Sequence, residues 1–228
     1  MKAAFFDIDG VVTRGFFVEK FWAHLAKKGL ISQNFMKKNN RHMQKYRRGE
    51  INYLEMMDGM NVVALAHKGA RQSAVRSEAR KFLSKYKPET FDYTDPLIAM
   101  LKRKGFKVIA ISGSNIELTE NYIDVLGFDK VYGTEFEVDD DVYTGEVKLH
   151  LGLKEAKGRI MEQLSFYNCV IGFGDSSQDV GILENVEIPI ALNPHKELET
   201  EARKHDWTIL RDGDDIIGHV SQLLEVLR

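Results

Sequence analysis

The stretch FFDIDGVV, residues 5–12, places two aspartates directly after an apolar run. Residues 2–6 are rich in Ala and Phe and contain no Gly or Pro, so they predict a short buried strand. Because side chains alternate along a strand, Asp7 and Asp9 point to the same side of it. Two carboxylates held this close repel each other unless a cation or a proton lies between them. The alternative is a solvated turn, but Gly10 and the two valines after it close the segment tightly and favour a charged site.

The composition is that of a soluble globular protein. Its 228 residues suffice for one large domain, or for a core with a smaller insertion. A net charge of -2 and a pI near 6.4 argue against nucleic acid as a partner, because general nucleic-acid binding needs a broad basic surface. The single cysteine, Cys169, cannot form an intramolecular disulfide, and its apolar neighbours predict a core position. No run is long enough to span a membrane, and Asp7 interrupts the first apolar segment too early for a signal peptide, so we expect a cytoplasmic protein.

Strand and helix patterns alternate along most of the chain. Further buried strands are predicted at FKVIAIS (106–112), CVIGFGD (169–175), IPIAL (188–192) and WTIL (207–210). A charged hairpin is predicted within residues 130–147, with its turn at 139–141. Strands that alternate with helices predict an α/β fold with a Rossmann-like, doubly wound and mostly parallel sheet.

The segment after the first strand has a different pattern. Residues 14–90 show helical spacing of apolar residues and no convincing strand. We therefore expect an all-helical cap, inserted into a core made of residues 1–13 and 91–228. The basic run at 37–48 is either a solvated helix face or a surface that recruits an anionic substrate. Four aromatic residues either pack the cap helices together or form an apolar wall around a leaving group: Phe16, Phe17, Phe21 and Trp22.

In a parallel α/β sheet, ligands bind beyond the carboxyl ends of the strands. Three predicted strands end there in polar groups: Asp7-x-Asp9, Ser112-Gly113-Ser114 and Gly174-Asp175-Ser176. Each group alone is common in turns, but the three together favour metal-assisted phosphoryl transfer. The carboxylates of Asp7 and Asp175 suit Mg²⁺, and Asp7 can also act as a nucleophile. Ser112 and the Gly113 amide can donate hydrogen bonds to phosphate oxygens.

A lysine would offset the remaining negative charge, and the predicted helix LKEAKGRIM (153–161) offers Lys154 and Lys157. Together, DIDGV, ISGS, KEAKG and GFGDSSQD resemble, in this order, the four motifs of the haloacid-dehalogenase-like phosphatase superfamily. The chain is most similar to the phosphoserine-phosphatase-like branch, whose helical cap is inserted just after the first strand.

The resemblance implies roles for the carboxylates. Asp7 becomes the nucleophile that forms an aspartyl phosphate, and Asp9 the general acid and then the general base. Asp7, Asp9 and Asp175 become the ligands of the cofactor Mg²⁺. The presence of Asp9 also separates phosphatases from true dehalogenases in this superfamily, so the resemblance implies a phosphatase.

The resemblance implies further roles around these carboxylates. Ser112 and Gly113 become the groups that bind the substrate phosphate. Asp179 resembles the acidic residue that supports the metal site through its water shell. Lys157 best matches the motif lysine, and Lys154, one turn earlier, is the alternative.

The same resemblance leaves the substrate open. Members of the branch hold phosphoserine with an acidic residue, expected here near Phe16, and an arginine, expected here near Met60. The sequence has neither, and Glu19, Arg47 and Arg48 are the candidates to replace them. We therefore expect an Mg²⁺-dependent phosphomonoesterase that acts on a small phosphorylated metabolite. The alternatives are a phosphoserine phosphatase proper, a phosphotransferase that uses the same aspartyl intermediate and, more remotely, a non-catalytic phosphate-binding or signalling module.

Overall fold

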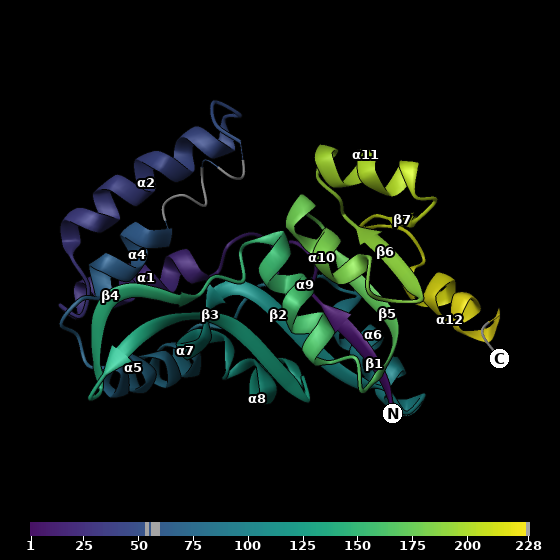
Figure 1. Ribbon diagram of the computed structural model, residues 1–228, viewed down its shortest axis with the longest axis horizontal. Coiled ribbons are helices and arrows are strands. Elements are labelled where there is room, and N and C mark those ends of the chain that lie inside the picture. Colours follow the sequence, from purple (N-terminus) through teal and green to yellow (C-terminus); the bar gives the residue numbers. More distant parts are fainter. Residues whose placement is uncertain (53–54, 56–59, 227–228) are drawn as a thin grey trace.

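The computed structural model describes residues 1–52, 55 and 60–226. Its strands are β1 (Lys2–Phe6), β2 (Lys107–Asn115), β3 (Lys130–Asp139), β4 (Val142–Leu149), β5 (Asn168–Gly174), β6 (Ile188–Leu192) and β7 (Thr208–Leu210). They form one sheet in the order β4-β3-β2-β1-β5-β6-β7 (Figure 1). Neighbouring strands are parallel, except that β3 and β4 are antiparallel. The expected Rossmann-like, mostly parallel α/β fold is confirmed.

Helices connect the strands and cover both faces of the sheet. Those between β1 and β2 are α1 (Val18–Lys27), α2 (Gln33–Arg47), α4 (Met60–His67), α5 (Gln72–Lys85) and α6 (Thr94–Arg103). The others are α7 (Ile116–Thr119), α8 (Tyr122–Leu126), α9 (Lys154–Gln163), the 3₁₀ helix η1 (Ser177–Asp179), α10 (Val180–Leu183), α11 (Lys196–Lys204) and α12 (Ile216–Val226). Among the described residues, no helix combines the length and the apolar character needed to cross a bilayer.

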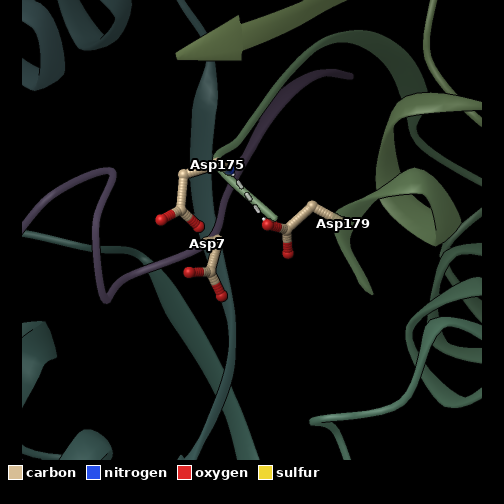
Figure 2. Close-up of side chains that lie close together, drawn as sticks. All are labelled: Asp7, Asp175 and Asp179. Atoms are coloured by element: carbon tan, nitrogen blue, oxygen red, sulfur yellow. Dashed lines mark hydrogen bonds between the residues drawn. The ribbon is translucent and has the colours of Figure 1, made fainter. Parts of the chain in front are cut away.

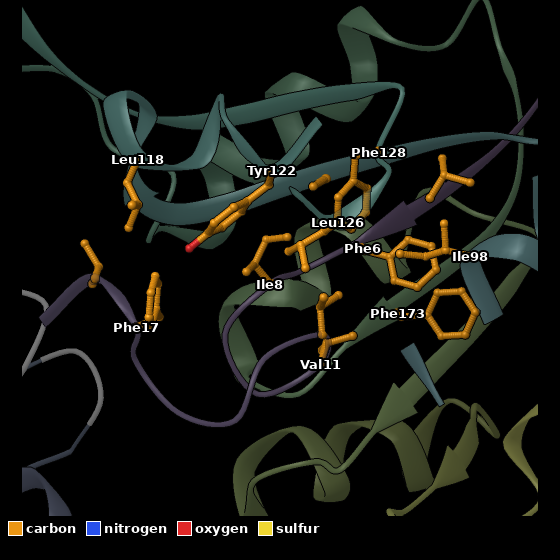
Figure 3. Packing of buried hydrophobic residues seen from close by; sticks show 14 of the residues in the cluster. Phe6, Ile8, Val11, Phe17, Ile98, Leu118, Tyr122, Leu126, Phe128 and Phe173 are labelled. Atoms are coloured by element: carbon orange, nitrogen blue, oxygen red, sulfur yellow. The ribbon is translucent and has the colours of Figure 1, made fainter. Parts of the chain in front are cut away.

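Strand β1 lies at the centre of the sheet because both of its faces are apolar. Ala4 and Phe6 pack into the larger cluster, with residues of α6, α8 and α12. Phe6 stacks on Phe173 of β5 with the ring centroids 4.4 Å apart, and both rings lie near Ile98 (Figure 3). On the opposite face, Ala3 and Phe5 pack with residues of α9 and α10. Burial on two faces therefore fixes the strand that carries the first aspartate motif.

The helices α1, α2, α4 and α5 follow β1, and Figure 1 shows α1, α2 and α4 grouped above β3 and β4. The two ends of this helical segment lie side by side. The Arg14 N–H at its start donates to the Glu89 carbonyl at its end, at 2.7 Å. Trp22 of α1 ties these helices to the sheet, since its Nε1–H donates to Asn115 Oδ1 at 2.8 Å in a buried position. The division into residues 1–13 with 91–228 and residues 14–90 stays a prediction.

The predicted hairpin is formed by β3 and β4, with Asp140 and Asp141 in the left-handed region at its turn. The segment before α5 lies along the outer edge of this hairpin. There the Tyr143 N–H donates to the Ala70 carbonyl at 3.0 Å, and the Gly69 N–H donates to the Tyr143 carbonyl at 2.9 Å. These hydrogen bonds attach the segment between α4 and α5 to the edge strand of the hairpin.

His67, the last residue of α4, is fully buried against this hairpin. Its Nδ1 lies 2.7 Å from the Val63 carbonyl, and its ring packs against Phe136 and Tyr143. The Nε2 atom has no hydrogen-bond partner among the described residues. Burial lowers the pKa of His67, although the Val63 carbonyl and the nearby Glu117 oppose the shift. The neutral ring is therefore the form that the fold accommodates.

We predict that His67 makes the stability of the protein depend on pH. Because its pKa is lowered on folding, its contribution is complete above the unfolded value of about 6.5 and is lost as pH falls through the folded value. Urea unfolding at pH 7.5 and 5.5 should show a smaller loss of stability for His67→Phe than for the wild type. The exposed His219 provides the control, since His219→Phe should keep the wild-type pH dependence. An equal loss in the wild type and His67→Phe would contradict the prediction.

Candidate active site

Three polar segments meet because their strands are neighbours in the sheet. β1 pairs with β2 on one side and with β5 on the other. Asp7 follows β1 directly, and its N–H donates to the carbonyl of Phe173 in β5 at 3.0 Å. The predicted strand 106–112 runs on to Asn115, which pairs with Thr134 of β3, so Ser112, Gly113 and Ser114 belong to the strand itself.

A buried acidic group lies at the point where these segments meet (Figure 2). Asp7, Asp175 and Asp179 each offer a carboxylate oxygen, and the three oxygens lie within 4.8 Å of one another. Their side chains are almost completely buried. The dashed line in Figure 2 marks the hydrogen bond from the Asp175 N–H to Asp179 Oδ2, which is 3.0 Å long. Hard oxygen atoms grouped in this way are the ligands that Mg²⁺ prefers.

Lys157 of α9 lies between two of these carboxylates. Its Nζ donates to Asp7 Oδ1 and to Asp179 Oδ1, both at 2.6 Å. Lys154 instead forms a half-exposed ion pair with Glu184 at 3.2 Å. Of the two lysines that the sequence left open, only Lys157 contacts the acidic group in the described structure.

Asp179 is held by its other oxygen. Asp179 Oδ2 accepts hydrogen bonds from the N–H of Asp175 and from the N–H and hydroxyl of Ser176, at 2.9 to 3.0 Å. This leaves Oδ1 for Lys157 and fixes both the loop after β5 and the lysine. Asp179 thus connects the loop after β5 to Lys157, in addition to being a member of the acidic group.

Gly10 allows the aspartate motif to approach the loop after β5. Its φ of +94° lies in the region that favours glycine, and a Cβ atom there would overlap with the carboxylate of Asp175. Asp175 can therefore hold its position only if residue 10 is a glycine.

Burial shifts the acid–base behaviour of the acidic group. It raises the pKa of Asp7 well above its ordinary value, although Lys157 opposes the shift. It also raises the pKa of Asp175 to about 6, against the hydrogen bond from His195. Burial by itself would lower the pKa of Lys157, but Asp179 and Asp7 raise it overall, so the ammonium form persists. Three carboxylates thus face one ammonium group, and the excess negative charge fits a site for a divalent cation.

Asp9 lies beside this group without joining it. Its Oδ2 accepts a hydrogen bond from the Ser114 hydroxyl at 2.7 Å. Its Oδ1 accepts weaker ones from the Thr13 hydroxyl at 3.3 Å and the Phe17 N–H at 3.4 Å. Burial raises the pKa of Asp9, and the Ser114 hydrogen bond lowers it in part. A carboxyl group of this kind can hold a proton that an exposed aspartate would lose.

A pocket opens above these groups, and its wall combines polar and apolar side chains. Asp7, Asp9, Lys157 and Asp175 contribute to its lining, and so do Gly113 and Ser114. Ser112 is fully buried instead, and its Oγ accepts a hydrogen bond from the Ser114 N–H at 3.1 Å. The remaining lining residues include Phe16, Val18, Glu19, Trp22, Met43, Ser176 and His195.

The four aromatic residues after β1 divide between the apolar core and the pocket. Phe17 and Phe21 are buried in the main cluster, whereas Phe16 and Trp22 also line the pocket. The basic side chains of α2 that the structure describes are exposed, namely Lys37, Lys38, Arg41 and Lys45, which agrees with a solvated helix face.

Glu19, Arg47 and Arg48, which the sequence offers as replacements for the phosphoserine ligands, do not all lie at the pocket. Glu19 lines the pocket. Arg48 is exposed and forms an ion pair with Glu50 at 2.7 Å. The side chains of Arg47 and Met60, and residues 56–59, lie outside the described part of the chain.

His195 is a site residue that sequence reasoning missed, because its position showed no ligand spacing. It precedes α11, and its N–H donates to the Asp175 carbonyl at 2.7 Å. Its Nε2 lies 3.4 Å from Asp175 Oδ2, so the side chain reaches the acidic group. The only signal was its place after the buried strand β6, whose carboxyl end faces the same edge as those of β1 and β5.

The sequence matches the haloacid dehalogenase-like hydrolases over residues 4–184, which is most of the chain. The chain belongs to this family. A curated relative of this hydrolase, a histidinol-phosphatase of Neisseria meningitidis serogroup C, is 25% identical over 221 residues, which cover 91% of this chain and 97% of the relative. A phosphoserine phosphatase of Archaeoglobus fulgidus is 28% identical over 132 residues, which cover 56% of this chain and 37% of that protein.

A solved structure described as a phospho-aspartyl intermediate analogue of phosphoserine phosphatase has the same fold as this hydrolase. It superposes with a TM-score of 0.66 at 18% identity and covers 97% of this chain and 98% of the other. The family and its phosphatase relatives identify the chain as a phosphatase.

We predict that the two lysines of α9 differ sharply when each is replaced. Lys157→Ala leaves Asp7 and Asp179 buried without their ammonium partner, and such a loss costs about 3–5 kcal/mol of stability. Lys154→Ala removes only an exposed ion pair, which is worth about 1 kcal/mol or less. Urea unfolding and phosphate release from 4-nitrophenyl phosphate should show losses of both stability and activity for Lys157→Ala only. An inactive Lys154→Ala beside an active Lys157→Ala would contradict the assignment.

Proposed function

We propose that this phosphatase is an Mg²⁺-dependent phosphomonoesterase that forms an aspartyl phosphate on Asp7. The observation that carries the proposal is that Asp7 and Lys157 line the pocket and are bonded to each other, while the fully buried Asp179 holds the same lysine. One oxygen of Asp7 is held by the lysine, and the carboxylate lines the pocket. A carboxylate in that position can attack a phosphorus atom held in line with it.

The residues of the acidic group fit Mg²⁺. Asp7 and Asp175 are the side chains that would hold the ion, and Asp179 would support it through bound water. The carboxylate of Asp9, which is bonded to Ser114 and Thr13, is better placed for proton transfer than for binding a metal through its side chain. When bound, the ion supplies positive charge that offsets the repulsion between a substrate phosphate and the carboxylates.

The protein groups divide the reaction into two steps. In the first, a carboxylate oxygen of Asp7 bonds to phosphorus, the bond from phosphorus to the leaving oxygen breaks, and Asp9 gives its proton to that oxygen. In the second, water attacks the phosphorus of the aspartyl phosphate and gives a proton to Asp9. The bond to Asp7 then breaks, and inorganic phosphate leaves. Lys157 offsets negative charge in both steps. Gly113, which lines the pocket, can contact a phosphate oxygen, whereas Ser112 is fully buried and bonded to the Ser114 N–H.

The pocket supports a substrate with an apolar or aromatic leaving group that carries an amine. Phe16, Trp22 and Met43 form an apolar wall, and Glu19 adds a carboxylate that can attract an ammonium group. The full-length relative is named a histidinol-phosphatase, and histidinol carries both an amine and an aromatic ring. We therefore propose phosphate esters of small amino alcohols as the substrate class, with L-histidinol phosphate as its first candidate and O-phospho-L-serine as its second.

Phosphate release from these two compounds, measured with MgCl₂ and with EDTA, tests the proposal. We expect turnover of L-histidinol phosphate with Mg²⁺, little turnover in EDTA, and recovery when excess Mg²⁺ is added back. Full activity in EDTA would contradict the metal requirement. Release of the alcohol without an equal release of phosphate, in the presence of an added acceptor alcohol, would indicate a phosphotransferase.

We also predict that Asp7→Asn abolishes turnover, because an amide oxygen cannot form the aspartyl phosphate. Circular dichroism and urea unfolding should show that the variant is folded, since the amide oxygen can still accept the Lys157 hydrogen bond. Asp9→Asn should be folded and slow for a different reason, namely the loss of the proton donor. Wild-type rates in Asp7→Asn would refute the nucleophile assignment.

A further inference from the structure

Ser114 makes the shortest hydrogen bond that Asp9 receives. Its hydroxyl lies 2.7 Å from Asp9 Oδ2, whereas Thr13 and Phe17 lie 3.3 and 3.4 Å from Oδ1. Ser114 is nearly buried and lines the same pocket as Asp9. It therefore contacts the carboxyl group to which proton transfer has been assigned.

The sheet fixes the position of Ser114. The residue lies in the last part of β2, where its N–H donates to Ser112 Oγ at 3.1 Å. The next residue, Asn115, pairs with Thr134 of β3 and accepts the buried hydrogen bond from Trp22 at 2.8 Å. Because the backbone is held on both sides, the Ser114 oxygen stays beside Asp9, while its hydroxyl hydrogen can still rotate.

A hydroxyl group suits a partner that changes its charge, because it both donates and accepts hydrogen bonds. It can donate to Asp9 when the carboxyl group is ionised, and it can rotate to accept from Asp9 when the group is protonated. The Phe17 N–H can only donate, so it favours the ionised form alone. Ser114 can therefore hold Asp9 in both of the states through which an acid–base residue passes.

We propose that Ser114 is a positioning residue that holds the Asp9 carboxyl group in place during both proton transfers. The proposal rests on the function proposed above. In the first step, the proton of Asp9 passes to the leaving oxygen while the bond from phosphorus to that oxygen breaks. The Ser114 hydroxyl then donates to the carboxylate that this transfer creates. In the second step, the proton returns to Asp9 from the attacking water, and the hydroxyl rotates to accept.

The leaving group decides how much this positioning matters. An alkoxide needs a proton as it leaves, whereas 4-nitrophenolate is a weak base and leaves without one. The ratio kcat/KM reports the steps up to cleavage of the bond to the leaving oxygen. We expect Ser114→Ala to lower kcat/KM for L-histidinol phosphate by roughly 10- to 100-fold, part of the roughly 10²- to 10⁴-fold that general acid catalysis supplies. For 4-nitrophenyl phosphate the loss should be much smaller, and Ser114→Thr, which keeps the hydroxyl, should recover most of the activity on the alkyl ester.

Thr134 offers a matched control, because it supports the same strand without touching Asp9. Its hydroxyl donates to the Gly113 carbonyl at 2.7 Å and accepts from the Leu151 N–H at 3.2 Å. Thr134→Val should therefore lower the activity on both substrates by the same factor. An equal loss on both substrates in Ser114→Ala, or no loss on either, would overturn the proposal. The proposed function fails by a separate result, namely undiminished turnover in Asp7→Asn.

Discussion

The site depends on one buried ion pair network, in which Lys157 joins Asp7 and Asp179. The lysine comes from α9, the first aspartate follows β1, and the second belongs to η1 after β5. Each partner is buried, so a charge without its counterpart would be costly, and the three elements are held in one arrangement. The network leaves negative charge in excess, which is the condition that a site for a divalent cation needs.

Backbone hydrogen bonds and close packing set this arrangement. Asp179 uses one oxygen for the loop after β5 and the other for Lys157, so the loop and the lysine are positioned by the same side chain. Gly10 lets the first aspartate motif approach that loop, since no other side chain fits against Asp175. The geometry of the acidic group is therefore built into the fold.

The helical segment after β1 contributes pocket-lining residues, among them Trp22 and Glu19 of α1. Trp22 lines the pocket and is bonded to Asn115 at the end of β2, so the apolar wall is fixed to the strand that carries Ser114. In the function we propose, this wall excludes water from the phosphate and contacts the leaving group, so the segment takes part in selecting the substrate. The same segment supplies Glu19, the carboxylate that we connect with an amine on the leaving group.

The sequence by itself determined the order of strands and helices, and with it the parallel sheet, because apolar periodicity is a local property of the chain. It also predicted Asp7, Asp9, Asp175 and Asp179 as site residues, because each of the two motifs that contain them is a short local pattern. Only the tertiary structure showed which of Lys154 and Lys157 contacts the acidic group, since residues three apart on a helix differ in which partner their side chains meet. It also brought His195 to the acidic group and showed that Ser114, which the sequence placed near the site, contacts Asp9. These partners lie 20 and 105 positions away in the sequence, and no local pattern records such contacts.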